Sequence, residues 1–226
     1  MRLWSDFLTH QGRPALKWKH YFPVYERHMA RYVNRPVTII EIGCGDGGSL
    51  QLWKQYLGPN ARIVGIDINP QCKTYEEDQI SVRIGGQADE KLLASVLREF
   101  GTPDIVLDDG SHVMKDQIET FRYLYPRTNP HGLYIVEDVH TSYMPRFGGG
   151  LRKEGTFIEM CKELIDELGS QTGGPEAAPP TDFTRSTLSI QFHDSVVVFE
   201  RGKTTHKHML KRGRGFGVEE DGQKHP

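Results

Sequence analysis

The sequence of 226 residues has little of three features that would each point to a class of protein. It holds only three cysteines, Cys44, Cys72 and Cys161, with no Cys-x-x-Cys pair, which argues against a disulfide framework and against a thiolate zinc site. No run approaches the roughly 18 apolar residues of a membrane helix, and the N-terminus lacks the apolar stretch of a signal peptide. We therefore expect a cytoplasmic protein with no membrane partner.

A strong net charge is also absent. The 28 lysines and arginines nearly cancel the 30 aspartates and glutamates, which leaves a formal net charge of −2. This balance gives no electrostatic basis for binding nucleic acid, so we expect a small-molecule partner. The hydrophobic fraction of 37% and the charged fraction of 26% are typical of a folded globular domain, and the length suits one domain rather than two.

What the sequence does contain is a repeated alternation of apolar strands and amphipathic helices. Five β-branched, apolar runs predict buried strands at residues 37–43, 61–68, 80–86, 103–110 and 132–139. The segments between them place apolar residues three and four positions apart, as in helices that cover one face of a sheet. The pattern predicts an α/β fold with a mostly parallel sheet, helices on both faces and a ligand crevice at the carboxyl ends of the strands.

The C-terminal part of the chain departs from this alternation. Residues 188–202 contain two strand-like runs separated only by His193, Asp194 and Ser195, which predicts an antiparallel hairpin. We divide the chain into an N-terminal helical cover (1–35), a main domain (36–202) and a tail (203–226). The cover is rich in aromatic residues, so we expect it to pack over the crevice or against another subunit of a homo-oligomer.

A glycine-rich loop, EIGCGDGG at residues 41–48, follows the first predicted strand. Its glycines allow a sharp turn and a close approach to a ligand, and the following helix N-terminus offers free N–H groups. Asp67, at the end of the second strand, is placed to bind both hydroxyls of a ribose. A turn that binds nothing and a solvated aspartate are the alternatives. Glu41 suits a ligand with a positively charged amino-acid end and is unfavourable beside a pyrophosphate, which favours S-adenosylmethionine over a nicotinamide dinucleotide.

Two acidic clusters end the fourth and fifth predicted strands, at residues 108–112 (DDGSH) and 137–140 (EDVH). In a sheet of order 3-2-1-4-5 these strands are neighbours, so both clusters emerge at the same edge. Four crowded carboxylates raise one another's pKa values or require a cation, and oxygen ligands suit Mg²⁺ or Ca²⁺ better than zinc or copper. Helix capping is the competing explanation, and we expect Ser111 to cap a helix that begins near Val113.

Two histidines lie in these clusters. His112 follows Asp109 by three residues, on the turn into the next helix, where it can face whatever the metal binds. An imidazole, whose ordinary pKa is about 6.5, is a suitable general base at neutral pH. His140 is the second catalytic candidate, and for either residue a plain surface histidine is the alternative.

These motifs resemble a known family. The loop at residues 41–48 is similar to the first motif of class I S-adenosylmethionine-dependent methyltransferases, E/D-x-G-x-G-x-G, whose seven-stranded sheet ends in a reversed strand. D-D-x-S-H at 108–112 and E-D-x-H-T-S-Y at 137–143 resemble the metal-dependent sugar O-methyltransferases of macrolide biosynthesis, of the mycinamicin and tylosin type. Relatives labelled cephalosporin-hydroxylase-like or rhamnosyl O-methyltransferases are similar in the same way. The resemblance covers residues 37–202.

The resemblance implies a Rossmann-like methyltransferase fold for residues 36–202, with S-adenosylmethionine and Mg²⁺ as cofactors. It implies methylation of a hydroxyl on a sugar or a glycosylated natural product, with His112 as the base. The metal ligands would be Asp109, Glu137 and Asp138. The expected cofactor contacts are Glu41, Gly43, Gly45, Ser49, Asp67, Gln87, Asp108 and Tyr21.

One departure from the family bears on the acceptor. The macrolide enzymes carry an additional N-terminal domain where this sequence has about 35 residues, so we expect the acceptor to differ. Three other functions remain open at this point. An iron-dependent oxygenase would use histidine and carboxylates as a facial triad but leaves Glu41 and Asp67 without a role. A nicotinamide dehydrogenase has no need of four acids, and the third alternative is a non-catalytic cofactor-binding subunit.

Overall fold

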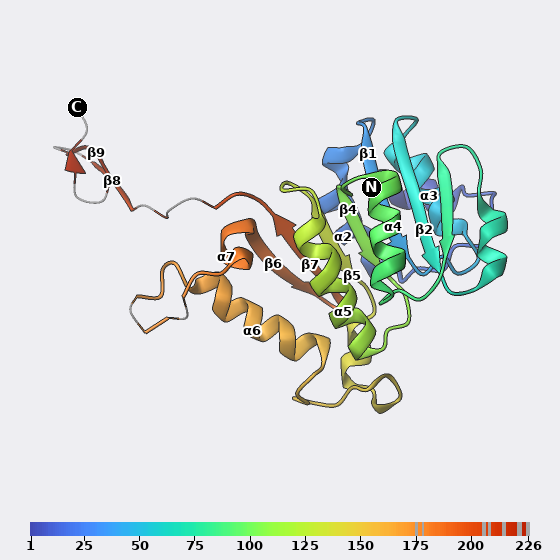
Figure 1. The fold of residues 1–226 in the computed structure, drawn as a ribbon. Helices are drawn as coiled ribbons and strands as arrows, with labels where there is room; N and C mark the ends of the chain where they lie inside the picture. The colour runs from blue at the N-terminus through green and yellow to red at the C-terminus, as the bar shows by residue number, and fades with distance from the viewer. Residues whose placement is uncertain are drawn as a thin grey trace.

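A seven-stranded sheet of order β3-β2-β1-β4-β5-β7-β6 forms the centre of the protein (Figure 1). The computed structural model describes residues 1–174, 176–177, 179–204, 207, 209–213, 216–220 and 223–224. The strands are β1 (Val37–Ile42), β2 (Ala61–Asp67), β3 (Ile80–Ile84), β4 (Ile105–Asp108), β5 (Leu133–Val136), β6 (Thr187–His193) and β7 (Val196–Arg201). β1 to β5 pair in parallel, whereas β7 is antiparallel to β5 and to β6. The predicted α/β, Rossmann-like architecture is confirmed.

The terminal hairpin is tighter than the sequence suggested. His193 is the last residue of β6 and pairs with Val196, so the turn consists of Asp194 and Ser195 alone. Ser195 takes the left-handed conformation, with φ of 65°.

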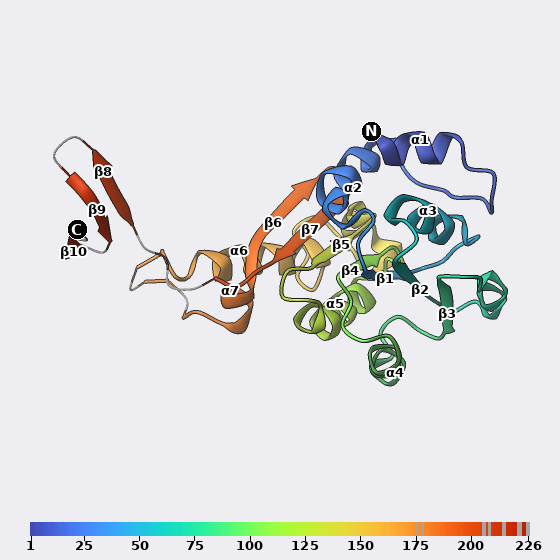
Figure 2. The same cartoon turned by 90° about the horizontal axis from the view of Figure 1, so that it is seen from above.

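Helices cover both faces of the sheet. Figure 2 shows α1, α2 and α3 on one side of it and α4 and α5 on the other. The helices are α1 (Arg2–Leu8), α2 (Phe22–Met29), α3 (Gly48–Leu57), α4 (Glu90–Phe100), α5 (Met114–Leu124), α6 (Phe157–Gly169) and α7 (Asp182–Ser186). Short 3₁₀ turns are η1 (Lys19–Tyr21), η2 (Ala30–Tyr32), η3 (Pro70–Tyr75), η4 (Tyr125–Arg127), η5 (Val139–Tyr143) and η6 (Pro145–Phe147).

Two hydrophobic cores follow from the period-two alternation of the strands. Ile39 and Ile40 are adjacent and both fully buried, but they point to opposite faces. Ile39 packs in the core that includes Trp53 of α3, and Ile40 packs in the core that includes Phe121 of α5. Because central strands are buried on both faces, their sequences are apolar throughout rather than alternating with polar residues.

The N-terminal segment is only partly helical, which corrects the expectation for residues 1–35. Residues 10–18, between α1 and η1, contain no helix. Pro14 lies in this stretch, and a proline in a helix interior removes a hydrogen bond and clashes with the preceding turn. The Pro14 carbonyl accepts a hydrogen bond from the N–H of Gly48 at 3.2 Å, and the Arg13 guanidinium donates to the carbonyl of Tyr75. The segment therefore lies across the loop that leads into α3.

The tail contains a second, smaller sheet. Its strands are β8 (Leu210–Gly213), β9 (Phe216–Glu220) and β10 (Gln223–Lys224), paired antiparallel in the order β10-β9-β8. Figures 1 and 2 both place it apart from the main sheet. Part of the predicted tail lies outside the described residues, namely residues 205–206, 208, 214–215, 221–222 and 225–226. Among the helices that are described, none combines the length and apolar character needed to span a membrane.

Candidate active site

The glycine loop lies at the carboxyl end of β1 and contacts the loop that follows β4. Gly43 has φ of 87°, and a Cβ added to it would stand 2.1 Å from the carbonyl oxygen of Asp109. Only glycine allows both this left-handed conformation and this approach. A cavity of about 330 Å³ lies over the loop. Its walls include residues 14–17, Gly43, Cys44, Gly45, Asp46, Ser49, Asp67, Asp109 and Gly110.

Asp67 holds the glycine loop in place. One carboxylate oxygen accepts the N–H of Cys44 at 2.7 Å, and the other accepts the N–H of Asn69 at 2.8 Å. Asp67 also lines a second cavity, of about 190 Å³, whose walls include Gln87, Gly110 and Ser111. The two cavities share Gly43, Asp67 and Gly110, so they form adjacent parts of one region above the sheet.

Gln87 and Asp108 are bound to each other beneath this region. The Gln87 amide donates to Asp108 Oδ1 at 3.2 Å, and its own oxygen accepts the N–H of Ser111 at 2.5 Å. Burial raises the pKa of Asp108 to about 7. Among the described residues, Gln87 lines the smaller cavity, whereas Asp108 lines neither cavity. The structure thus brings Gln87 to a cavity wall and puts Asp108 behind it.

Glu41 and Ser49 form a buried pair at the base of the larger cavity. The Ser49 hydroxyl donates to Glu41 Oε2 at 2.9 Å, and Glu41 is fully buried. Burial raises the pKa of Glu41, while the nearby ammonium of Lys17 opposes the rise. Ser49 lines the cavity, and Glu41 lies behind Ser49, to which it is hydrogen-bonded.

The acidic clusters meet at one edge of the sheet, as predicted from adjacent parallel strands. β4 and β5 pair in parallel, and the N–H of Glu137 donates to the carbonyl of Asp108 at 2.9 Å. Asp109, Glu137 and Asp138 all line a third cavity, of about 440 Å³, together with residues 16–19. Burial and the charge of Asp109 raise the pKa of Glu137, and Lys17 opposes the rise.

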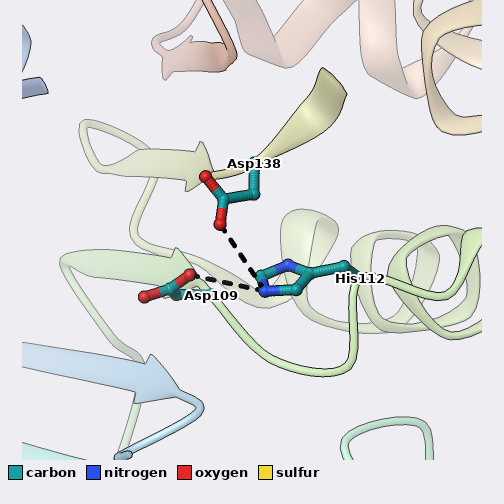
Figure 3. Close-up of side chains that lie close together, drawn as sticks. All are labelled: Asp109, His112 and Asp138. Atoms are coloured by element: carbon teal, nitrogen blue, oxygen red, sulfur yellow. Dashed lines mark ion pairs between the residues drawn. The ribbon is translucent and has the colours of Figure 1, made fainter. Parts of the chain in front are cut away.

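His112 faces two of these acids (Figure 3). Its Nε2 lies 3.9 Å from Asp109 Oδ1 and 3.7 Å from Asp138 Oδ2. One ligand atom from each of the three residues lies within 4.8 Å of the other two, which is a spacing that a single cation can bridge. Two carboxylate oxygens in such a set suit a hard divalent cation. His112 has φ of 58°, and Phe147 packs edge-on against its ring at 6.1 Å between centroids.

The left-handed conformation of His112 also corrects the predicted cap of α5. The helix begins at Met114 with Val113 as its N-cap, two residues later than a Ser111 cap would place it. The Ser111 hydroxyl instead accepts the N–H of Val113 at 3.1 Å and donates to Asp116 at 2.8 Å. Ser111 therefore stabilises the turn before the helix, and this turn directs His112 toward the acids.

His140 and Tyr21 reach the acidic cluster from the other side of Asp138. The Tyr21 hydroxyl donates to Asp138 Oδ1 at 2.5 Å. His140 Nδ1 lies 3.9 Å from the same oxygen and is hydrogen-bonded to the Ser195 hydroxyl. Tyr21 was expected among the cofactor contacts, but the structure puts it beside Asp138, and among described residues it lines neither cavity over the glycine loop.

Lys17 is the site residue that the sequence did not reveal. Its ammonium lies 2.6 Å from Asp109 Oδ2, 3.1 Å from both oxygens of Glu137 and 3.5 Å from Glu41 Oε1. Its side chain is only 2% exposed, and the surrounding carboxylates raise its pKa well above the ordinary value although burial opposes them. No spacing signal distinguished it among the 28 lysines and arginines, because its partners lie 92 and 120 residues further along the chain.

The strand order, glycine loop and reversed strand β7 define a Rossmann-like methyltransferase fold. No family model matches the sequence. The structure is similar to that of a methyltransferase from the mycinamycin biosynthetic pathway in complex with Mg and SAH, with a TM-score of 0.77 and 34% identity. The match covers 89% of this chain and 54% of that one. A complex of the same enzyme with Mg, SAH and mycinamycin VI gives the same TM-score.

Curated relatives agree with the structural match. The sequence is 37% identical to the 8-demethyl-8-(2-methoxy-alpha-L-rhamnosyl)-tetracenomycin-C 3'-O-methyltransferase of Streptomyces olivaceus, over 83% of this chain and 50% of that protein. It is 34% identical to the mycinamicin VI 2''-O-methyltransferase of Micromonospora griseorubida, over 88% of this chain and 52% of that protein. The protein is thus a homologue of sugar O-methyltransferases of antibiotic biosynthesis, and it spans about half the length of these relatives.

Proposed function

We propose that the protein is an S-adenosylmethionine- and Mg²⁺-dependent O-methyltransferase that acts on a hydroxyl of a sugar or a glycosylated natural product. The observation that carries this proposal is the position of Asp109. It lines both the cavity over the glycine loop and the cavity beside the acidic cluster. One oxygen of the same side chain faces His112. A methyl donor in the cavity over the glycine loop and a hydroxyl in the cavity beside the acidic cluster would therefore meet beside a candidate base and a candidate cation site.

The cavity over the glycine loop suits the methyl donor. The glycine loop and the start of α3 let a ligand approach the backbone closely. Each oxygen of Asp67 already accepts one backbone N–H but keeps a second lone pair, so the carboxylate can also accept ribose hydroxyls. Gln87 on the wall of the smaller cavity is suited to contact an adenine edge. The relative from the mycinamycin pathway holds SAH, which supports this assignment.

The acidic cluster fits a divalent cation because its donor set is oxygen-rich and already oriented. Tyr21 holds one oxygen of Asp138, and Lys17 contacts Asp109 and both oxygens of Glu137, so the three predicted ligands converge at one edge of the sheet. A bound Mg²⁺ would orient the acceptor oxygens and lower the pKa of the hydroxyl that is methylated. The related enzyme contains Mg, which supports a divalent cation as cofactor.

His112 would act as the base, with the cation held by Asp109, Glu137 and Asp138, so that the His112 Nε2 stays free of the metal. Its Nε2 takes the hydroxyl proton while the acceptor oxygen forms a bond to the methyl carbon and the methyl–sulfur bond of the sulfonium breaks, which releases S-adenosylhomocysteine. The carboxylates of Asp109 and Asp138 stabilise the imidazolium that results. His140 is less suited to the role, because its Nδ1 is hydrogen-bonded to Ser195.

The third cavity supports a glycosylated acceptor. Its apolar wall includes Trp18, which is 56% exposed and can stack against the C–H face of a sugar ring. The relatives act on rhamnosyl and mycinamicin compounds, as their names state. We also propose a homo-oligomer, supported by the exposed apolar side chains of Leu188 and Phe192 on the edge strand β6, which light scattering would test.

The rival functions have less support. The three clustered residues comprise one histidine and two aspartates, whereas an iron-dependent oxygenase uses two histidines and one carboxylate. The relatives are O-methyltransferases and so give the oxygenase no support. A non-catalytic cofactor-binding subunit differs from the proposed enzyme in a measurable way, since it would bind S-adenosylmethionine without producing S-adenosylhomocysteine.

The test is a methyl-transfer assay with rhamnosylated and macrolide acceptors, read by mass spectrometry with and without EDTA. We expect S-adenosylhomocysteine to form only when a divalent cation is present. His112→Gln should bind S-adenosylmethionine normally in calorimetry but lose about 10²-fold or more in kcat, and His140→Gln should lose less. Absence of cofactor binding, or turnover that EDTA leaves unchanged, would contradict the proposal. A larger loss in His140→Gln would assign the base to His140.

A further inference from the structure

The side chain of Glu137 is turned toward Lys17 and not toward His112. Both of its carboxylate oxygens lie 3.1 Å from the Lys17 ammonium. In the part of the chain that the structure describes, the group able to hold a metal consists of Asp109, His112 and Asp138, without Glu137. The acid predicted as the third metal ligand is thus engaged by a lysine in this structure.

The Lys17 ammonium lies among the carboxylate oxygens of three acids. It contacts Asp109 Oδ2 and both oxygens of Glu137, and Glu41 lies 3.5 Å away. Three carboxylates face one positive charge, and the lysine and Glu137 side chains are each only 2% exposed. When all three acids are ionised, one lysine leaves an excess of negative charge, which favours exchange of the lysine for an ion of higher charge.

Lys17 can leave this position without unfolding of the sheet. It lies in the non-helical segment 10–18, between Leu16, which is 93% exposed, and Trp18, which is 56% exposed. A lysine ammonium is a point charge on a flexible four-carbon chain, so it can withdraw by rotation about its side-chain bonds. The segment itself stays attached through the Pro14 carbonyl, which accepts the N–H of Gly48.

We propose that Lys17 is an internal counter-cation, so that its ammonium and a divalent cation compete for Asp109 and Glu137. Metal binding would displace Lys17 and release Glu137 to become a metal ligand. Because residues 14–17 line the cofactor cavity and residues 16–19 line the acceptor cavity, this exchange would also link metal binding to both cavities. The inference rests on the proposed function, which supplies the cation.

The first test measures Mn²⁺ binding by electron paramagnetic resonance in the wild type, Lys17→Met and Lys19→Met. Lys19→Met is a matched control, because it removes the same charge two residues further along the chain, in η1, at an exposed side chain whose ammonium lies near the Trp4 ring. We expect Lys17→Met to bind Mn²⁺ at least about tenfold more tightly than the wild type, since a competing charge at contact distance is removed. Lys19→Met should bind within about twofold of the wild type. Equal or weaker binding by Lys17→Met overturns the inference.

The second test uses the wild type and does not depend on the folding of a variant. Acetic anhydride labels accessible amines, and mass spectrometry gives the labelling rate of each lysine. Lys17 should label slowly without metal, because its side chain is 2% exposed, and at least about tenfold faster with saturating Mn²⁺. Lys115, whose side chain is 77% exposed, serves as the control and should label equally in both conditions. Metal binding without a change at Lys17 overturns the inference.

The outcomes separate this inference from the proposed function. If the wild type and Lys17→Met bind Mn²⁺ equally, the proposal that Lys17 is a counter-cation is wrong, while the proposal of a metal-dependent enzyme still holds. If neither protein binds Mn²⁺, both the counter-cation and the metal in the proposed function are wrong. If only Lys17→Met binds, the lysine competes strongly enough to exclude the ion from the wild type, which supports the inference.

Discussion

Gly43 connects the cofactor loop to the acidic cluster, so Gly43→Ala is the most informative single change at this site. The residue has φ of 87°, and a Cβ would stand 2.1 Å from the Asp109 carbonyl oxygen and 3.0 Å from the Gly110 Cα. These atoms are backbone and cannot rotate aside. The N–H of Gly43 donates to Ile66 and the N–H of Asp109 donates to Ile42, so both loops are tied to the sheet. One loop must therefore move away from the other.

The size of the effect follows from two contributions. A left-handed conformation costs a residue with a Cβ about 1–2 kcal/mol. Overpacking against fixed neighbours adds about 1–3 kcal/mol, so Gly43→Ala should lower the free energy of unfolding by about 2–5 kcal/mol. Gly45→Ala is the matched control in the same loop. Gly45 has φ of 52°, and among the described residues no atom lies within 4 Å of its added Cβ, so only the first contribution applies.

Urea unfolding of both variants measures this difference, and calorimetry with S-adenosylhomocysteine and Mn²⁺ measures its effect on the site. We expect Gly43→Ala to weaken binding of both ligands, because the displaced loop carries Asp109, which lines both cavities. Gly45→Ala should leave Mn²⁺ binding unchanged, since nothing lies against its added Cβ. Equal losses of unfolding free energy in the two variants would refute the reasoning from the Asp109 contact.

Two further predictions concern the core and the pH dependence of stability. Phe199→Ala should lower the free energy of unfolding, measured in urea, by about 3–5 kcal/mol, because Phe199 is fully buried. Phe192→Ala, at a side chain that is 44% exposed, should lower it clearly less, and equal losses would contradict this. Burial lowers the pKa values of His28 and His193, whose rings are 5.8 Å apart, so the folded state binds fewer protons than the unfolded state. Their contribution to stability is present above the ordinary pKa of about 6.5 and is lost as pH falls. In urea unfolding, His28→Gln should therefore lose less stability than the wild type between pH 7.5 and 5.5, and an unchanged pH dependence would contradict this.

Several parts of the fold could be predicted from local pattern alone. Ile39 and Ile40 belong to a continuous apolar run, and such runs indicate a strand buried on both faces. Local pattern failed where a single residue changed the path of the chain. Pro14 lies in the stretch where no helix forms between α1 and η1, and α5 has Val113 as its N-cap instead of the predicted Ser111, after the left-handed His112. Conformations of this kind depend on contacts with distant residues, which periodicity does not contain.

The sequence by itself determined the strands of the main sheet, the glycine loop and the meeting of the Asp109 and Glu137 clusters at one edge, because parallel strands put their carboxyl ends on the same side of a sheet. Only the tertiary structure decided which groups these acids contact. Lys17 reaches Asp109 across 92 residues and Glu137 across 120, and Tyr21 reaches Asp138 across 117. The physical reason is that side-chain contacts over such separations depend on the path of a loop across the sheet, and neither spacing nor composition specifies that path.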